Sequence, residues 1–567
     1  MHFFDASRMT RWLGKLWLAL ACAMPWLALA QSPPSAGSLL QQSEQALPRP
    51  QPKLPPRPRV APPEPMAEPG AVTVLVQSFQ LDGNTLIDTP TLQAALGPWL
   101  NRALSFAQLK QAAEAVVSTY RSAGWWVQAY LPKQDVTEGR VTIHIVEAAM
   151  GQALLTGKAP QRMVAERLVR TVQSIHPSGE PLSTAKLDRA LLLLDDLPGV
   201  SVVGSLMPGR AHGETDVGLV VTDEALWAGS LTADNHGGLA TGTQRLSANL
   251  ALNSPLRQGD LLSVNALKTQ GSHYLRLAYS LPWGYEGWRV GLHTSGLNYS
   301  VIGANAYMGL QGSAFNFGLD ASYPLWRSQM RNLNLQFSAD HKRFENTALS
   351  LPTSRYAVAV LNAGLAATQF DEWQGGGASA LSLSSTWGQL RPDDAEPVPS
   401  QNSALQSGAF RKFNLNLSRQ QTLKGDYSAY AAWGWQGASR ELDASEKLYL
   451  GGVNGVRAYP ANEISGSRGH TLLLELRQRW QDRWTLAAFH DHGWVKRNVA
   501  VGDTSARDHA MLRGLGVSAA WQGQQGLDVK ATLARRIGEN PLPLSNGADS
   551  DGTLKTWRLW LNATVSF

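Results

Sequence analysis

The chain has 567 residues, of which 17% are charged, and its 50 Lys and Arg exceed its 44 Asp and Glu to give a formal charge of +6. This length excludes a single small domain, and a hydrophobic content of 43% excludes a wholly disordered chain. The basic residues are scattered rather than gathered into runs, so we expect no nucleic-acid partner.

Residues 1–30 have the pattern of a secretory signal peptide. Basic residues precede an apolar run, and Ala28 and Ala30 supply the small residues of a cleavage site. The run contains Cys22, the only cysteine, so we expect no disulfide in the exported chain. The residues before Cys22 fit a lipoprotein motif poorly, and we expect no lipid anchor.

A short helix and a proline-rich segment come next. Residues 35–47, within the segment 31–47, predict a short helix that carries Leu39 and Leu40. The prolines of residues 48–71 cannot join a helix or a sheet, so this segment is predicted to be an extended tether. The tether would let the helix dock at a distance from the rest of the chain, and the alternative is a disordered tail.

Two small α/β modules are predicted over residues 72–147 and 148–225, and both read in the order β-α-α-β-β. In the first module Val72, Val74 and Val76 alternate as a strand. Later elements of the two modules are a helix from residue 105, strands at 125–131 and 141–147, helices at 165–175 and around 187–194, and strands at 200–206 and 217–221.

From residue 226 onward, helical periodicity gives way to segments in which apolar and polar residues alternate. No stretch after the signal is long and apolar enough for a membrane-spanning helix, so a membrane role requires a β-barrel. At about 21 residues per strand and linker, residues 226–567 allow some sixteen strands. The predicted fold class is therefore α+β domains followed by a transmembrane barrel of sixteen antiparallel strands.

The last strands give the clearest membrane pattern. They are predicted at 471–480, 484–495, 511–521, 526–537 and 556–567. Short turns alternate with long loops, Trp484 and Trp494 lie at the two ends of one strand, and the chain stops on the aromatic residue Phe567. A soluble β-sandwich or propeller is the alternative, since alternation alone does not distinguish lipid from a protein core.

A glycine-containing loop, residues 451–470, is predicted to fold into the barrel from a strand that ends near Leu450. It contains the run Val456-Arg457-Ala458-Tyr459.

The strand at 484–495 contains Phe489-His490-Asp491-His492-Gly493, and its alternation turns Phe489, Asp491 and Gly493 into the lumen.

The layout and the two motifs resemble the two-partner secretion outer-membrane transporters, the TpsB family. The resemblance covers nearly the whole mature chain. Residues 189–199 are similar to the second helix of that family's polypeptide-transport-associated (POTRA) domain. Two departures stand out: Ala458 replaces the glycine of the family's Val-Arg-Gly-Tyr motif, and residues 466–469 carry Ser467 where an acidic residue is usual.

The resemblance implies roles for several residues. Residues 72–147 and 148–225 would be the two POTRA domains, and the helix of residues 31–47 would plug the lumen. Arg457 would pair with Asp491 and hold the loop inside the barrel, a contact that we call the loop-to-barrel lock. The other residues of the two motifs would support this contact: Val456, Tyr459, Phe489 and Gly493. The alternative is a solvated Arg457 and an ordinary lumen carboxylate at Asp491.

No nucleophile elbow, phosphate-binding loop or pair of catalytic carboxylates is present, so we expect no catalytic residue, no cofactor and no enzymatic activity. His490 and His492 share one face of their strand, as metal ligands can. The alternation points both rings outward and no third ligand is identifiable nearby, so no metal is expected.

The resemblance implies an exporter that recognises an unfolded exoprotein through its POTRA domains. The expected partners are a cognate exoprotein of the TpsA type, outer-membrane lipid and lipopolysaccharide, and the barrel-assembly machinery during biogenesis. This machinery would recognise the terminal residue Phe567. A factor that inserts other barrels into the membrane is the second hypothesis. A passive porin is the third, and the tandem modules disfavour it.

Overall fold

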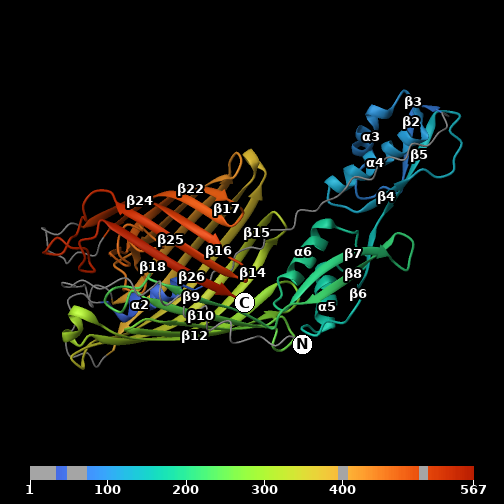
Figure 1. Ribbon diagram of the computed structural model, residues 1–567. Helices are drawn as coiled ribbons and strands as arrows, with labels where there is room; N and C mark the ends of the chain where they lie inside the picture. Colours follow the sequence, from blue (N-terminus) through green and yellow to red (C-terminus); the bar gives the residue numbers. More distant parts are fainter. Residues whose placement is uncertain (1–33, 48–72, 394–406, 497–507) are drawn as a thin grey trace.

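The computed structural model describes residues 34–47, 73–393, 407–496 and 508–567. Figure 1 shows a β-barrel with two small α/β modules beyond one of its mouths, here called the module-side mouth. The predicted signal peptide, residues 1–30, and the proline-rich segment, residues 48–71, lie outside the described residues.

Sixteen antiparallel strands form one closed barrel, which confirms the predicted fold class. The strands are β9 (Trp227–Asp234), β10 (Arg245–Asn253), β11 (Leu261–Lys268), β12 (Ser272–Trp283), β13 (Trp288–Ser300), β14 (Gln311–Arg327), β15 (Arg331–Ala348), β16 (Leu351–Asp371), β17 (Gly377–Pro392), β18 (Gly408–Thr422), β19 (Tyr427–Ala438), β22 (Arg468–Trp480), β23 (Trp484–Lys496), β24 (His509–Gln522), β25 (Leu527–Arg536) and β26 (Trp557–Ser566). Short 3-10 turns, η2 (Gly303–Met308) and η3 (Trp373–Gly375), lie between strands.

The barrel closes because its last strand pairs with its first. β26 pairs with β9 from Asn562 opposite Asp234 to Ser566 opposite Ser230. Beyond them the Phe567 N–H donates to the carbonyl of Gly229 at 3.0 Å. A Cβ at Gly229 would lie 2.7 Å from the Phe567 ring, so glycine leaves the space that this ring needs. Closure gives every strand two hydrogen-bonded neighbours, as a lipid environment requires.

The two faces of the last strands differ as the alternation predicts. On β26, Trp557 and Leu559 are exposed on the outer face, whereas the neighbouring Trp560 is buried in the lumen. Trp480 lies opposite Trp484, which in turn lies opposite Trp521, so that aromatic rings line the outer face near the module-side mouth. The outer surface is therefore apolar with an aromatic border.

The predicted start of the inward-folding loop was wrong. The barrel strand β19 ends at Ala438, and residues near Leu450 belong instead to β20 (Leu448–Leu450). β20 pairs with β21 (Ile464–Gly466) in a separate two-stranded sheet. The apolar residues of β20 face the barrel wall, and their alternation is the same as that of a lipid-facing strand. The loop, here called the lumen loop, therefore comprises residues 439–467.

The first module has a mixed sheet in the order β2-β5-β4 and a separate pair β1-β3. The predicted strand around Val74 is β1, which pairs with β3 and stays outside the three-stranded sheet. The elements are β1 (Thr73–Val76), β2 (Ser78–Asp82), α3 (Thr89–Leu96), the 3-10 turn η1 (Gly97–Trp99), β3 (Arg102–Ser105), α4 (Phe106–Ser122), β4 (Val127–Tyr130) and β5 (Arg140–Glu147). Ser105 and Gln108 form the capping box of α4.

The second module has the predicted element order. It comprises β6 (Ala149–Leu155), α5 (Ala165–Ile175), α6 (Thr184–Asp195), β7 (Val200–Pro208) and β8 (Glu214–Asp223), with sheet order β6-β8-β7. Leu168 of α5 and Leu194 of α6 pack with Val217 of β8 in one core. None of the helices in the described ranges is both long and apolar enough to span a membrane.

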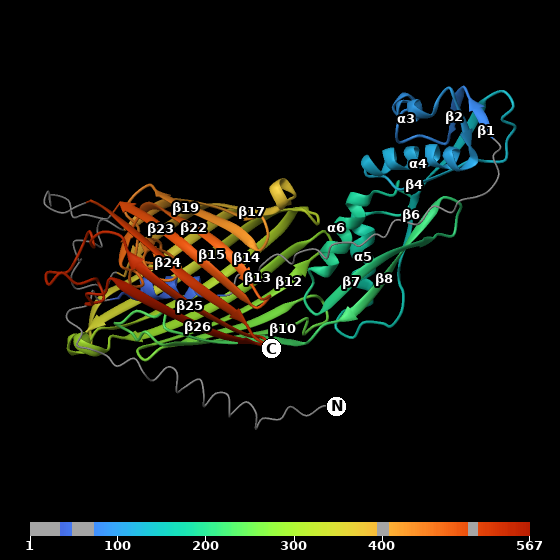
Figure 2. The same cartoon turned by 45° about the horizontal axis from the view of Figure 1, so that its top comes forward.

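The second module is attached to the barrel by its helices, which face the module-side mouth in Figure 2. Arg327, at the end of β14, donates to both carboxylate oxygens of Asp196 at 2.7 and 2.8 Å. Arg189 of α6 donates to the carbonyl of Pro324 at 2.7 Å. These contacts fix the module against the barrel turns.

Candidate functional site

The lumen loop folds against the inner wall of β23 and β24, where glycines leave room for it. A Cβ at Gly514 of β24 would lie 2.7 Å from the Cβ of Ala458. A Cβ at Gly493 of β23 would lie 2.9 Å from a methyl group of Leu450. Within the loop, Gly451 has a φ of +89°, which an L side chain rarely adopts, and this glycine permits the turn after β20.

The structure brings Arg457 of the lumen loop and Asp491 of β23 together. The backbone N–H of Arg457 donates to Asp491 Oδ2 at 3.0 Å, Nε donates to the same oxygen at 2.9 Å, and Nη2 donates to Oδ1 at 2.6 Å. Asp491 is fully buried and Arg457 is 5% exposed. The pair is therefore bidentate, enclosed by protein, and reinforced through the backbone.

Arg457 has further contacts that the sequence did not indicate. Its Nη1 donates to Glu475 Oε1 of β22 at 2.7 Å, and its guanidinium group lies 3.4 Å from the centre of the Phe489 ring. Trp560 Nε1 donates to the Arg457 carbonyl at 2.7 Å. Burial would lower the pKa of Arg457, but the carboxylates of Asp491 and Glu475 outweigh it and raise that pKa.

The remaining motif residues surround this arginine. Val456 and Tyr459 are buried in one apolar cluster with Phe489. Ala458, which replaces the family's glycine, has no left-handed backbone conformation, so its methyl group causes no strain. Ser467, the other departure, accepts a hydrogen bond at Oγ from the Leu442 N–H at 2.8 Å.

A second buried contact holds the loop to the opposite wall, and no sequence motif indicated it. Glu446 of the lumen loop is 4% exposed. Lys342 Nζ of β15 donates to its Oε1 at 2.9 Å, and Lys412 Nζ of β18 donates to Oε2. Burial would raise the pKa of Glu446, but the two ammonium groups outweigh it and hold that pKa at about 2.

A third contact joins the lumen loop to the loop after β25. The buried Glu463 accepts hydrogen bonds from the Ser550 N–H at 3.0 Å and from Asn540 Nδ2 at 2.5 Å. Burial raises the pKa of Glu463. Asp549 beside it is fully buried and pairs with Arg536 at 2.8 Å.

Helix α2 (Ala36–Gln45) lies inside the barrel (Figure 1). Its Leu40 is fully buried in a cluster with residues of β13 to β16. The Ala36 N–H donates to Asn346 Oδ1 at 2.9 Å, and Gln41 Nε2 donates to the Lys447 carbonyl of the lumen loop at 2.8 Å. The helix therefore contacts both the wall and the loop.

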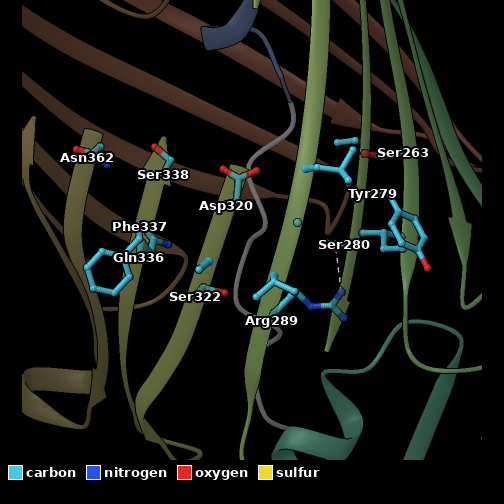
Figure 3. A pocket seen from close by; sticks show the side chains of 16 residues that line it. Ser263, Tyr279, Ser280, Arg289, Asp320, Ser322, Gln336, Phe337, Ser338 and Asn362 are labelled. Atoms are coloured by element: carbon cyan, nitrogen blue, oxygen red, sulfur yellow. Dashed lines mark hydrogen bonds between the residues drawn. The ribbon is translucent and has the colours of Figure 1, made fainter. Parts of the chain in front are cut away.

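A pocket of about 380 Å³, lined by polar and apolar residues, lies on the inner wall toward the module-side mouth (Figure 3). Arg289 of β13 donates to Ser280 Oγ of β12 at 2.9 Å. Asp320 and Ser338 come from β14 and β15 and lie across the pocket. The inner wall here offers charged and hydroxyl groups.

The strand edges of the two modules carry exposed apolar side chains. β4 is an edge of the first sheet, and Tyr130 on it is 46% exposed, with Trp126 just before it at 39%. β7 is an edge of the second sheet, and its Val203 is 65% exposed. Such edges present backbone N–H and C=O groups beside apolar side chains.

The chain matches two family models. The model described as haemolysin secretion/activation protein ShlB/FhaC/HecB matches residues 213–520, and the model of the ShlB-type POTRA domain matches residues 74–148. Among curated relatives, the heme/hemopexin transporter protein HuxB of Haemophilus influenzae (strain 86-028NP) is 25% identical over 85% of this chain and 86% of its own. The outer membrane transporter CdiB of Escherichia coli is 26% identical over 83% and 80%.

A solved structure has the same fold. CdiB from Escherichia coli superposes with a TM-score of 0.68 at 22% identity, covering 95% of this chain and all of that one.

Proposed function

The chain belongs to the haemolysin secretion/activation protein family, ShlB/FhaC/HecB, whose members are two-partner secretion transporters, and we propose that it moves one unfolded exoprotein from the periplasm to the cell surface through its barrel. The barrel lies in the outer membrane of a Gram-negative bacterium, with the POTRA domains in the periplasm. The observation that carries the proposal is a closed barrel whose lumen contains two segments of its own chain, α2 and the lumen loop.

The POTRA domains, which we assign to residues 72–147 and 148–225, would recognise the exoprotein. An extended chain can add a strand to the exposed edges β4 and β7 through main-chain hydrogen bonds. Trp126, Tyr130 and Val203 would select apolar side chains of that chain. The periplasm has no ATP, so folding of the cargo outside the cell would supply the direction of transport.

Arg457, with Asp491 and Glu475, would act as the loop-to-barrel lock. The buried Arg457 cation pairs with the buried Asp491 and with the partly buried Glu475, which also pairs with Arg477, so the loop has one strongly preferred position. Helix α2 would plug the lumen at rest and leave when cargo engages, with residues 48–71 as its tether. The plug and the loop together would keep small solutes from leaking through a barrel of sixteen strands.

Further partners belong to the same proposal. The exoprotein would be the cognate TpsA-type partner, and the barrel would be embedded in lipid and lipopolysaccharide. The barrel-assembly machinery would recognise the terminal residue Phe567. We propose no catalytic role, because a transporter of this family needs none.

The proposal is tested by cross-linking a stalled exoprotein inside the barrel. The mature chain is expected to lack cysteine, so Ser338→Cys in the lumen pocket introduces a unique thiol. Ala339→Cys, the next residue, is the matched control on the outer face of β15. The stalled exoprotein carries one introduced cysteine, and an added mild oxidant takes up the two electrons that the two thiols release. We expect a disulfide between the exoprotein and the lumen variant alone. Equal labelling of both variants, or of neither, would contradict passage through the lumen.

A further inference from the structure

Two histidines and a tryptophan are stacked on the outer face of the barrel. His470 of β22 lies with its ring 5.5 Å from that of His492 on β23, at an interplanar angle of 20°. The same His470 ring lies 5.8 Å from Trp494, at 22°. The strand alternation that turns Asp491 into the lumen turns all three rings outward. Polar rings on a lipid-facing surface require a partner or a position near the interface.

An arginine completes this group. Arg513 of β24 is exposed and is the cross-strand partner of His492. Its side chain makes no hydrogen bond or ion pair with another residue of the described ranges. We call His470, His492, Trp494 and Arg513 the rim cluster. It presents one permanent cation, two imidazoles and an indole, and no acidic side chain.

The height of the rim cluster in the membrane can be derived from β23. Trp484 and Trp494 lie ten residues apart on this strand. At about 3.3 Å per residue and a tilt of about 40°, they are separated by about 25 Å along the barrel axis, the height of the apolar band of outer-membrane barrels. Trp494 therefore marks the outer interface, and His492 and Arg513 lie about 5 Å inside it.

The phosphorylated headgroup of lipopolysaccharide borders this apolar band in the outer leaflet, and the long side chain of an arginine about 5 Å inside the band can extend to it. A guanidinium group binds phosphate through two parallel hydrogen bonds, and imidazole N–H groups can donate to the remaining oxygens. From this geometry we infer that the rim cluster is a binding site for a phosphate group of lipid A, with Arg513 as the principal ligand.

The inference rests on the outer-membrane location and not on export. The stacked rings would hold the imidazoles in place beside the phosphate, and Trp494 would lie against the sugar and acyl region. A metal ion is a poorer occupant, because the described residues contain no group of three histidine, cysteine or acidic side chains that could hold one.

The test measures binding of three probes to the purified full chain in detergent: lipid A with both phosphates, dephosphorylated lipid A, and inorganic phosphate. We expect wild-type protein to bind the phosphorylated lipid at least about tenfold more tightly than the dephosphorylated lipid, as one charged bidentate contact provides. Arg513→Gln combined with His470→Gln and His492→Gln should abolish this difference. Arg513→Lys, which keeps the charge but loses the two parallel hydrogen bonds, should retain only part of it.

A matched control lies elsewhere on the outer face. His341 and Arg343 of β15 also lie two residues apart and are exposed, and the double variant His341→Gln, Arg343→Gln should keep the wild-type preference. Equal loss in this control, or an unchanged preference in the rim-cluster variant, would overturn the assignment. Inorganic phosphate competing as well as the phosphorylated lipid would show a free-anion site and would also overturn it.

Discussion

The Arg457 side chain donates two hydrogen bonds to Asp491 and one to Glu475, so its removal leaves the fully buried Asp491 carboxylate without a cation, whereas Glu475 keeps Arg477. Breaking a buried pair in this way costs about 3–5 kcal/mol. We therefore expect Arg457→Ala to lower the free energy of unfolding of the inserted barrel by about that amount, and to lower export. Urea unfolding in detergent and the amount of exoprotein in the medium measure the two effects.

Arg477 is the control for that prediction. It pairs with the same Glu475 but its side chain is 27% exposed and belongs to a barrel strand, so Arg477→Ala should cost about 0–1 kcal/mol. Normal export by Arg457→Ala would contradict the role of the lock.

Two substitutions of Ala458 should have opposite effects on the lumen loop. Ala458→Gly should leave export unchanged, because the backbone there is already in an ordinary conformation. Ala458→Leu should cost about 1–3 kcal/mol, because the wall at Gly514 leaves no room for a larger side chain. Protease sensitivity of the lumen loop measures its displacement. A loop that is displaced by glycine and tolerates leucine would refute this packing.

Glu446 predicts a pH dependence. Because its pKa is lowered from 4.5 to about 2, its contribution is fully present above about pH 4.5 and is lost as the pH falls toward 2. The melting temperature of wild type minus that of Glu446→Gln should therefore be constant from pH 7 to 5 and shrink below 4.5. A difference that stays constant down to pH 2.5 would contradict the ionised contact with Lys342 and Lys412.

The residue-scale predictions from sequence were uneven for a physical reason. Arg457 and Asp491 could be paired because strand alternation gives the facing of Asp491 and the motif gives its partner. Glu475 could not, because lumen-facing charges on β-strands look alike until the register of neighbouring strands is known. Glu446 could not either, because it lies in the lumen loop, where strand alternation does not tell which wall the side chain meets. The outward facing of His492 followed from alternation, but its stacking on His470 depends on the pairing of β22 with β23.

Helix α2 predicts a change in conductance at the scale of an element. A Cβ at Gly37 would lie 3.0 Å from the Ser445 N atom, so Gly37→Leu should force the helix away from the lumen loop. The single-channel conductance in planar bilayers should rise. Gln45→Leu introduces the same side chain at an exposed position of the same helix and should leave conductance unchanged. Equal conductance of both variants would argue that α2 does not plug the lumen.

The boundaries of strands whose apolar face contacts lipid could be predicted from the alternation of apolar and polar residues. The prediction was wrong where the apolar face packs against protein. The ends of β22, β23 and β25 lie within a few residues of their predicted positions. The segment at Leu448–Leu450 has the same pattern but packs on Phe489 and Leu512 in the lumen. Alternation with a period of two indicates that a strand has one apolar face. It does not indicate whether lipid or protein covers that face.

The whole molecule joins two α/β modules, a helix inside the lumen and a barrel of sixteen strands on one chain. Closure of sixteen strands could be predicted from the length of the alternating region, since every strand in lipid needs two neighbours. The attachment of the second module to the barrel through Asp196 and Arg327 could not, because it depends on where the barrel turns lie in space.

The central claim is that this barrel exports one exoprotein and does not assemble other barrels. Its most direct test is deletion of the chain, followed by quantification of all proteins in the medium and in the outer-membrane fraction. The account predicts that one secreted protein disappears from the medium while the other outer-membrane barrels keep their normal amounts, and that the intact chain restores secretion. Depletion of many barrels together, with secretion of every exoprotein retained, would contradict it.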